Sequence, residues 1–322
     1  MSEPARTAHE LEYSPSSCIP SIDVELAEYT ARSAAAARRF AARELAYGDR
    51  PSQRLVVFEA APGAPLHVFV HGGYWQALGA ADSLFPATDL VPAGKSFAAV
   101  DYTLAPHATI GQIIDECTRA VECVVRDVSP SHVTVSGSSA GAHLAAHVAL
   151  RADVRIDRLV LLSGVFLLHP LIGTYVDEPL GLDEHTATAW SVPLERRPSA
   201  QLLVLHGEHE TASFKAQSAR LAAAWGVPTV EVTGRNHFDL VHDLAAIDLR
   251  PGLPIEPSDA PSGPDDPAAE AAEAAGAAER PGAPRRLAPE ALHPDGPGVT
   301  AEHDGRAGRP GAPAGLDDAR RR

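Results

Sequence analysis

The stretch "HVTVSGSSAGAHLAAHVAL", residues 132–150, decides the fold. Its apolar, β-branched first half predicts a buried strand, and its second half, rich in small residues, predicts a helix from about Ala140. Gly137 and Gly141 stand two positions on either side of Ser139, which gives the pattern G-x-S-x-G. A sharp strand-to-helix turn needs small residues at both places and pushes the central side chain outward. We therefore expect Ser139 to project from the carboxyl end of a strand.

A nucleophilic serine needs partners, and the chain offers them in a suitable order. A serine hydroxyl is a weak nucleophile, so it requires a histidine base that a carboxylate orients. Glu208 and Glu210 follow one later strand-like run, and His237 follows the next. Without such partners Ser139 would simply cap the helix, as serine often does. The order serine, acid, histidine favours a serine hydrolase.

Both partners have competitors. His206 and His209 lie close to the acidic loop, but His237 follows the last predicted strand and precedes the last predicted helix, where the base of such a triad is expected. Glu210 is preferred over Glu208 as the acid, although spacing alone hardly separates the two.

The rest of the first 250 residues alternates strand-like and helix-like segments. Several strand-like runs are continuously apolar, which is typical of strands covered on both faces. A long amphipathic helix is expected over 24–46. The pattern predicts an α/β fold with a mostly parallel central sheet that helices cover on both faces. The expected strands are 54–60, 66–70, 96–102, 132–137, 158–166, 201–207 and 229–234.

The stretch "HGGYW", residues 71–75, follows one of these strands. Attack on a carbonyl places negative charge on oxygen, and fixed backbone N–H groups stabilise that charge. We expect the N–H groups of Gly72, Gly73 and Ala140 to form this oxyanion hole. A phosphate-binding loop is the weaker interpretation, because no Lys-Ser/Thr follows and no G-x-G-x-x-G opens a helix.

Composition excludes several classes of function. The formal net charge is −15, which argues against a nucleic-acid or anionic-membrane surface. The cysteines, Cys18, Cys117 and Cys123, are too few and too scattered for a disulfide scaffold or a structural zinc site. No secretory signal and no run of eighteen uncharged apolar residues is present, so a cytoplasmic protein without a membrane span is expected.

Composition changes sharply after about residue 250. Residues 251–322 contain no Phe, Trp or Tyr and are rich in Pro, Ala, Gly and acidic residues. Such a segment buries too little apolar surface to offset its ordering entropy. We therefore expect a folded domain over 1–250 and a disordered tail over 251–322.

Several motifs together resemble the kynurenine formamidases (arylformamidases), a family of the α/β-hydrolase fold. The broader esterase and lipase group more often carries a third glycine where this chain has "HGGYW". The resemblance covers about residues 10–250 and leaves the tail unexplained. Its further motifs are "EYSPSS" (12–17), "DYTLAP" (101–106), "GSSAGAHLAAH" (137–147), "LIGTYVDEPLGLDEHTA" (171–187), "GEHETASFKAQS" (207–218) and "GRNHFDLV" (234–241).

The resemblance implies hydrolysis of an N-formyl arylamide, N-formyl-L-kynurenine to L-kynurenine and formate in tryptophan breakdown, with no metal or organic cofactor. It assigns Ser139 as nucleophile and His237 as base, and it places the oxyanion hole at Gly72, Gly73 and Ala140. The family's acid is usually an aspartate followed by "SPEF"; the matching position here is Glu210 in "ETASF". A carboxylesterase acting on short acyl or aryl esters and a non-catalytic binding protein are the alternatives.

The substrate pocket is less well defined by the sequence. An insertion over about 167–198 is expected to form a small cap over the serine. Tyr74, Trp75, Tyr102 and Tyr175 could supply aromatic walls, and ordinary packing is the competing role, above all for Trp75. A small-molecule substrate is the expected partner, and a homodimer is a further expectation because such families often pair.

Overall fold

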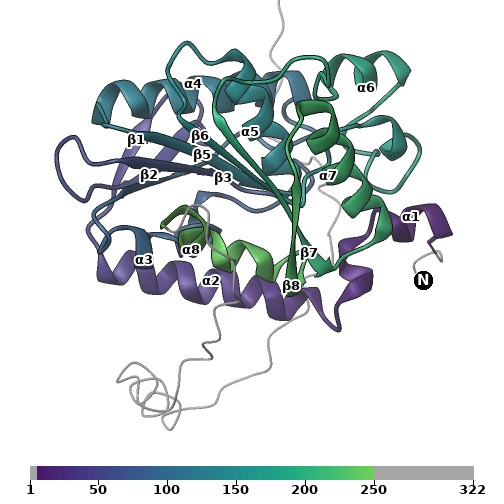
Figure 1. Cartoon of the computed structure of the whole chain (residues 1–322), viewed down its shortest axis with the longest axis horizontal. Helices are drawn as coiled ribbons and strands as arrows, with labels where there is room; N and C mark the ends of the chain where they lie inside the picture. Colours follow the sequence, from purple (N-terminus) through teal and green to yellow (C-terminus); the bar gives the residue numbers. More distant parts are fainter. Residues whose placement is uncertain (1–5, 250–322) are drawn as a thin grey trace, which may run out of the picture. The chain divides into compact units, whose positions relative to one another are not determined.

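The computed structural model of the chain describes residues 6–249, and these residues form one eight-stranded sheet with the strand order β1-β2-β4-β3-β5-β6-β7-β8 (Figure 1). Strand β2 pairs antiparallel with β1 and β4, and all other neighbours are parallel. The strands are β1 (Arg43–Ala46), β2 (Arg54–Phe58), β3 (Leu66–Val70), β4 (Ser96–Val100), β5 (Val133–Ser138), β6 (Arg158–Leu162), β7 (Gln201–His209) and β8 (Thr229–Asn236).

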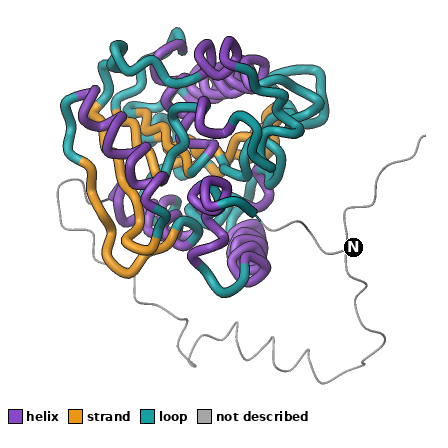
Figure 2. The backbone as a smooth tube through the Cα atoms, turned by 90° about the vertical axis from the view of Figure 1, so that its right-hand side faces the viewer, coloured by secondary structure: helices purple, strands orange, loops and turns teal. Residues whose placement is uncertain are grey.

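Helices cover both faces of this sheet. Every residue of β3, β4, β5 and β6 is buried, and successive side chains enter opposite core layers. Val68 packs in the layer with α4, α5 and α7, whereas Phe69 packs in the layer with α2, α3 and α8. Figures 1 and 2 show helices on both sides of the sheet. The helices are α1 (Ala8–Glu12), α2 (Ile22–Arg39), α3 (Ala87–Leu90), α4 (Ile110–Val128), α5 (Ala140–Arg151), α6 (Glu184–Trp190), α7 (Ala212–Trp225) and α8 (Leu244–Leu249), with short 3-10 turns at Pro15–Cys18, Ala80–Asp82, His169–Leu171 and Asp239–Asp243.

The doubly covered, mostly parallel sheet expected from the sequence is confirmed, but one strand and several short helices, among them α1, α3 and α6, were not expected. The helix expected over 24–46 ends at Arg39, and Arg43–Ala46 forms the edge strand β1. Phe40 already has an extended backbone, and Arg43 lies opposite Val57 of β2. The residues of β1 alternate between half-buried and exposed and have high helical propensity, so pairing with β2 rather than local preference decides their conformation.

A buried polar cluster fastens α8 to the sheet. Asp248 Oδ2 accepts from Lys95 Nζ at 2.9 Å and lies 2.9 Å from His67 Nδ1. His67 Nε2 lies 2.6 Å from Ser136 Oγ, and Arg158 Nη1 donates to Asp248 Oδ1 at 3.3 Å. Burial raises the pKa of Asp248, but the contacts with His67 and Lys95 outweigh it and hold this pKa well below its usual range.

The N-terminal segment 7–18 packs against distant parts of the chain. Thr7 caps α1 in a capping box with Glu10. Glu12 O accepts from Thr211 Oγ1 at 2.6 Å, and Glu12 Oε2 accepts from Ser213 N at 3.0 Å, at the start of α7. These contacts hold the segment beside the carboxyl ends of β7 and β8.

The insertion over 167–198 contains the turn His169–Leu171 and α6. Val192 N donates to Phe166 O at 2.8 Å and closes the insertion at its base. At the end of α6, Trp190 O lies 2.6 Å from His143 Nε2 and 3.0 Å from His147 Nε2, so this part rests on α5. No helix within residues 6–249 is both long and apolar enough to cross a membrane. The tail expected over 251–322 lies outside the described residues.

Candidate active site

Ser139 sits at a strained turn between β5 and α5. Its backbone has φ 56° and ψ −120°, and its N–H donates to Leu162 O at 2.8 Å. A Cβ added at Gly137 would lie 2.1 Å from Gly141 O, and one added at Gly141 would lie 2.1 Å from Val70 O. Neither position tolerates a side chain, which is the physical reason for the G-x-S-x-G pattern. The Ser139 side chain makes no capping hydrogen bond to α5, so Ser139 does not act as a side-chain cap of this helix.

His237 and Glu210 meet at the carboxyl end of the sheet. His237 Nδ1 lies 3.1 Å from Glu210 Oε2, and both side chains are buried. Glu210 Oε1 accepts from Ser163 Oγ at 2.5 Å and from Gly207 N at 2.5 Å. In a neutral His237 the proton faces the carboxylate on Nδ1, which leaves Nε2 as a hydrogen-bond acceptor. Phe214 packs against the edge of the ring at 4.5 Å and fixes its orientation.

The charge state of Glu210 follows from these contacts. Burial raises the pKa of Glu210, but the hydrogen bond and charge of His237, with the Ser163 and Gly207 donors, lower it below the usual value. Glu210 is therefore an ionised carboxylate at neutral pH. Glu208 instead accepts from Gly234 N at 2.8 Å on the surface. Neither His206 nor His209 lines the pocket that contains His237.

The loop after β3, residues 71–75, is called the glycine loop here and has an unusual backbone. A Cβ at Gly72 would lie 2.9 Å from Ser138 O and 3.2 Å from Ser139 Cβ, and one at Gly73 would lie 2.2 Å from Ala77 O. Gly73, Tyr74 and Trp75 all have positive φ, at 91°, 51° and 60°. The loop therefore passes directly beside Ser139 in a conformation that only surrounding contacts can hold.

Tyr102 supplies the main contact that holds this loop. Its hydroxyl donates to His71 O at 3.1 Å and to Gly72 O at 3.2 Å, and its ring stacks on His71 at 4.2 Å. In a trans peptide the N–H points opposite to the preceding carbonyl. The N–H groups of Gly72 and Gly73 therefore point away from the buried phenol, and no group within residues 6–249 accepts from them. The Ala140 N–H is likewise one of the unpaired donors at the start of α5.

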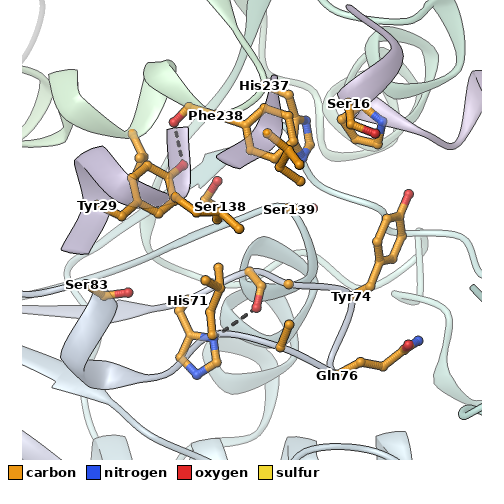
Figure 3. A pocket seen from close by; sticks show the side chains of 18 of the residues that line it. Ser16, Tyr29, His71, Tyr74, Gln76, Ser83, Ser138, Ser139, His237 and Phe238 are labelled. Atoms are coloured by element: carbon orange, nitrogen blue, oxygen red, sulfur yellow. Dashed lines mark hydrogen bonds between the residues drawn. The ribbon is translucent and has the colours of Figure 1, made fainter. Parts of the chain in front are cut away.

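A pocket of about 390 Å³ opens at these residues (Figure 3). Ser139 and His237 are only 7% and 5% exposed, so a substrate reaches them through this pocket. Apolar lining residues come from α2, the segment around Phe85 and the residues after β8. The N-terminal segment and the loop after β3 supply further lining residues. The lining residues include Arg6, Ser16, Ile22, Leu26, Tyr29, Gly72, Gly73, Tyr74, Phe85, Ser138, Ser139, Tyr175, His237, Phe238 and Val241.

The four aromatic residues expected at the pocket have divided roles. Tyr74 and Tyr175 line it, and the Tyr74 hydroxyl donates to Tyr13 O at 2.5 Å. Trp75 and Tyr102 are fully buried and do not line it. Their expected role as pocket walls is therefore corrected: Tyr102 braces the glycine loop, and Trp75 packs edge-on against His143 at 5.2 Å. Aromatic type alone does not reveal on which side of a loop a ring packs.

The N-terminal contribution to the pocket was not expected from the sequence. Arg6, Ser16, Ile22, Leu26 and Tyr29 all lie before the first predicted strand. Of the insertion that was expected to form the cap, only Tyr175 lines the pocket. The motif "EYSPSS" was the available signal, since it precedes α2 and contains residues of the pocket wall.

Comparisons with known proteins identify the family of the chain. A family model described as "alpha/beta hydrolase fold" matches residues 67–203. The kynurenine formamidase of Danio rerio is 31% identical over 263 residues, covering 73% of this chain and 90% of that protein. Esterase LipQ of Mycobacterium tuberculosis is 28% identical over 254 residues, and the match covers 65% of this chain and 59% of that protein.

A solved structure of a protein from Silicibacter sp. TM1040, provisionally described as a thioesterase, is similar to this chain with a TM-score of 0.66. The two sequences are 27% identical, and the match covers 73% of this chain and 93% of that protein. The similarity to the Danio rerio enzyme extends over 90% of that protein. The chain belongs to the kynurenine formamidase family of the α/β-hydrolase fold.

Proposed function

We propose that this chain is a serine hydrolase that removes the formyl group from N-formyl-L-kynurenine, yielding L-kynurenine and formate. The observation that carries the proposal is the contact between Glu210 and His237 at the wall of the same pocket that Ser139 lines. The kynurenine formamidase named among its relatives supports the choice of substrate.

The proposed first stage transfers the formyl group to the enzyme. Ser139 Oγ attacks the formyl carbon while His237 Nε2 takes its proton. Negative charge develops on the formyl oxygen, and the N–H groups of Gly72, Gly73 and Ala140 stabilise it, each by about 3 kcal/mol. His237 then donates its proton to the arylamine nitrogen, the C–N bond breaks, and a formyl ester remains on Ser139.

The second stage releases formate. His237 takes a proton from a water molecule, whose oxygen attacks the formyl ester in the same oxyanion hole. The ester bond breaks, formate departs and Ser139 regains its proton. Throughout, ionised Glu210 stabilises the imidazolium and keeps the His237 proton on Nδ1 in the neutral state.

The test is the turnover of N-formyl-L-kynurenine, followed by absorbance, in wild-type protein and in Ser139→Ala. We expect Ser139→Ala to lose at least about 1000-fold in kcat, because no other group replaces the nucleophile. Ser131→Ala is the matched control, since Ser131 is an exposed serine ahead of the same strand. Persistent turnover in Ser139→Ala with an unchanged melting temperature would contradict the serine mechanism.

The second candidate is a carboxylesterase, which the similarity to Esterase LipQ favours. It would use the same residues, so only comparative kinetics distinguishes the two. A protein that hydrolyses p-nitrophenyl acetate readily and leaves N-formyl-L-kynurenine intact would be an esterase. A protein that turns over neither substrate and does not react with a fluorophosphonate probe would be the non-catalytic alternative.

A further inference from the structure

Among the described residues that line the pocket, one side chain is fully charged. It belongs to Arg6, and no Lys, Asp or Glu within residues 6–249 lines the cavity. The remaining polar lining consists of hydroxyls, the Gln76 amide and histidines. An anionic part of a ligand therefore meets one cation in this pocket, at the side formed by the N-terminal segment.

The Arg6 side chain is held in place by a small polar platform. Arg6 Nη1 donates to Ser14 Oγ at 3.0 Å, and its guanidinium lies 4.1 Å above the Tyr175 ring. The hydroxyl of Ser14 is in turn 3.0 Å from that of Tyr175. The hydroxyls of Tyr74 and Tyr175 both donate to Tyr13 O, at 2.5 Å and 3.4 Å. The platform joins the N-terminal segment, the glycine loop and the insertion.

Most of the donors of Arg6 remain available. A guanidinium has five N–H groups, and within residues 6–249 only Ser14 accepts from one of them. The neighbouring anion, Glu10, is engaged elsewhere: Glu10 Oε2 accepts from Thr7 N at 2.8 Å, and Glu10 Oε1 accepts from Tyr175 N at 3.2 Å. Planar paired donors match a carboxylate, which they bind with two parallel hydrogen bonds.

The apolar part of the lining is suited to an aromatic ring. Ile22 and Leu26 of α2 belong to it together with Phe85, Phe238 and Val241. Tyr29 closes its end, since its hydroxyl donates to Phe238 O at 2.5 Å and is no longer free for a ligand (Figure 3). The same pocket is thus lined by apolar side chains, by one cation and by Ser139.

We propose that Arg6 binds the α-carboxylate of an N-formylated aromatic amino acid, and so selects anionic substrates over neutral esters and formamides of the same reactivity. This inference rests on the proposed function, because it takes Ser139 as the reacting group. Arg6 contacts the substrate far from the bond that breaks, so it contributes to binding rather than to the chemical step.

The experiment compares Arg6→Gln with wild type on a charged and a neutral formamide, N-formyl-L-kynurenine and formanilide. A charge-assisted pair at a partly exposed site changes binding by about tenfold. We expect KM for N-formyl-L-kynurenine to rise about tenfold with kcat nearly unchanged, and kcat/KM for formanilide to stay the same. Arg6→Lys restores part of the loss, because it keeps the charge without the paired donors. Arg38→Gln, which removes an exposed arginine of α2 outside the pocket, leaves both substrates unaffected.

Two results would overturn the inference. An equal loss on both formamides would mean that Arg6 only supports the fold of the segment, and no loss on either would mean that it does not contact substrate. If wild-type protein lacks formamidase activity, the proposed function fails separately. The preference is then measured on p-nitrophenyl acetate and on an aryl ester that carries a carboxylate. Retention of the Arg6-dependent preference for the anionic ester supports carboxylate binding, and its absence refutes it.

Discussion

Replacing Glu210 by glutamine tests how the carboxylate acts on the histidine. The side chain keeps its size, so the outcome depends on which end of the new amide faces His237. Gly207 N–H is an obligate donor that lies 2.5 Å from Glu210 Oε1. The amide oxygen must stay there to accept from it, which turns the amide NH2 toward His237 Nδ1. A donor at that place forces the histidine proton onto Nε2 and removes the acceptor that Ser139 needs.

The expected loss follows from this reversed tautomer. A triad acid changed to its amide lowers kcat by about 10⁴-fold, and we expect Glu210→Gln to fall within about tenfold of that figure. The assay is single-turnover cleavage of N-formyl-L-kynurenine, with the melting temperature measured on the same sample. Glu208→Gln is the matched control, since Glu208 is a neighbouring carboxylate that contacts Gly234 rather than His237. A Glu210→Gln protein that keeps more than about a tenth of wild-type kcat would refute the reasoning, as would an equal loss in Glu208→Gln.

Two further predictions concern residues outside the pocket. Tyr102→Phe removes the hydroxyl that holds two carbonyls of the glycine loop, so we expect kcat to fall about tenfold with KM unchanged; a change in KM alone would contradict this role. Asp248→Asn leaves Lys95 and Arg158 without a buried counter-charge, so urea unfolding should show a loss of about 3 kcal/mol. Because the folded pKa of Asp248 lies below its ordinary value of 3.8, its contribution is complete above that pH and lost as pH falls further. The stability difference between wild type and Asp248→Asn should therefore be constant above about pH 5 and shrink in more acidic solution; a difference that grows on acidification would contradict the sign.

Features that local sterics dictate were predictable from the sequence. The turn at Ser139 leaves no space for a Cβ at Gly137 or Gly141, so the G-x-S-x-G pattern predicts the backbone conformation of Ser139. The contact between His237 and Glu210 was predictable because parallel strands bring their carboxyl ends to one edge of the sheet. Glu210 lies 3.1 Å from His237, whereas Glu208 contacts Gly234.

Features that depend on contacts between distant segments were not predictable. Arg6 reaches the pocket because Glu12 is bound by Thr211 and Ser213, almost two hundred residues later, and no local pattern encodes that pairing. Tyr102 likewise packs on the side of the glycine loop where its hydroxyl meets the carbonyl oxygens of His71 and Gly72. The direction of these carbonyl groups cannot be predicted from a sequence pattern.

Within the described residues, two clusters each contain a serine, a histidine and a carboxylate, and they differ in access to a pocket and in the charges around the carboxylate. Ser136, His67 and Asp248 are connected by contacts of 2.6 Å and 2.9 Å, which is the connectivity of a catalytic triad. All three are buried outside the pocket that Ser139 and His237 line, and Lys95 and Arg158 also contact the aspartate.

Ser136 is buried away from the pocket, and Lys95 and Arg158 already compensate the charge of the Asp248 carboxylate. At the other cluster, no lysine or arginine contacts Glu210, within the residues described, so its charge remains available to stabilise a protonated His237. Its serine also lies at a pocket, beside unpaired backbone donors. Access to substrate and an uncompensated carboxylate, rather than the residue types alone, therefore distinguish the candidate active site from the structural cluster.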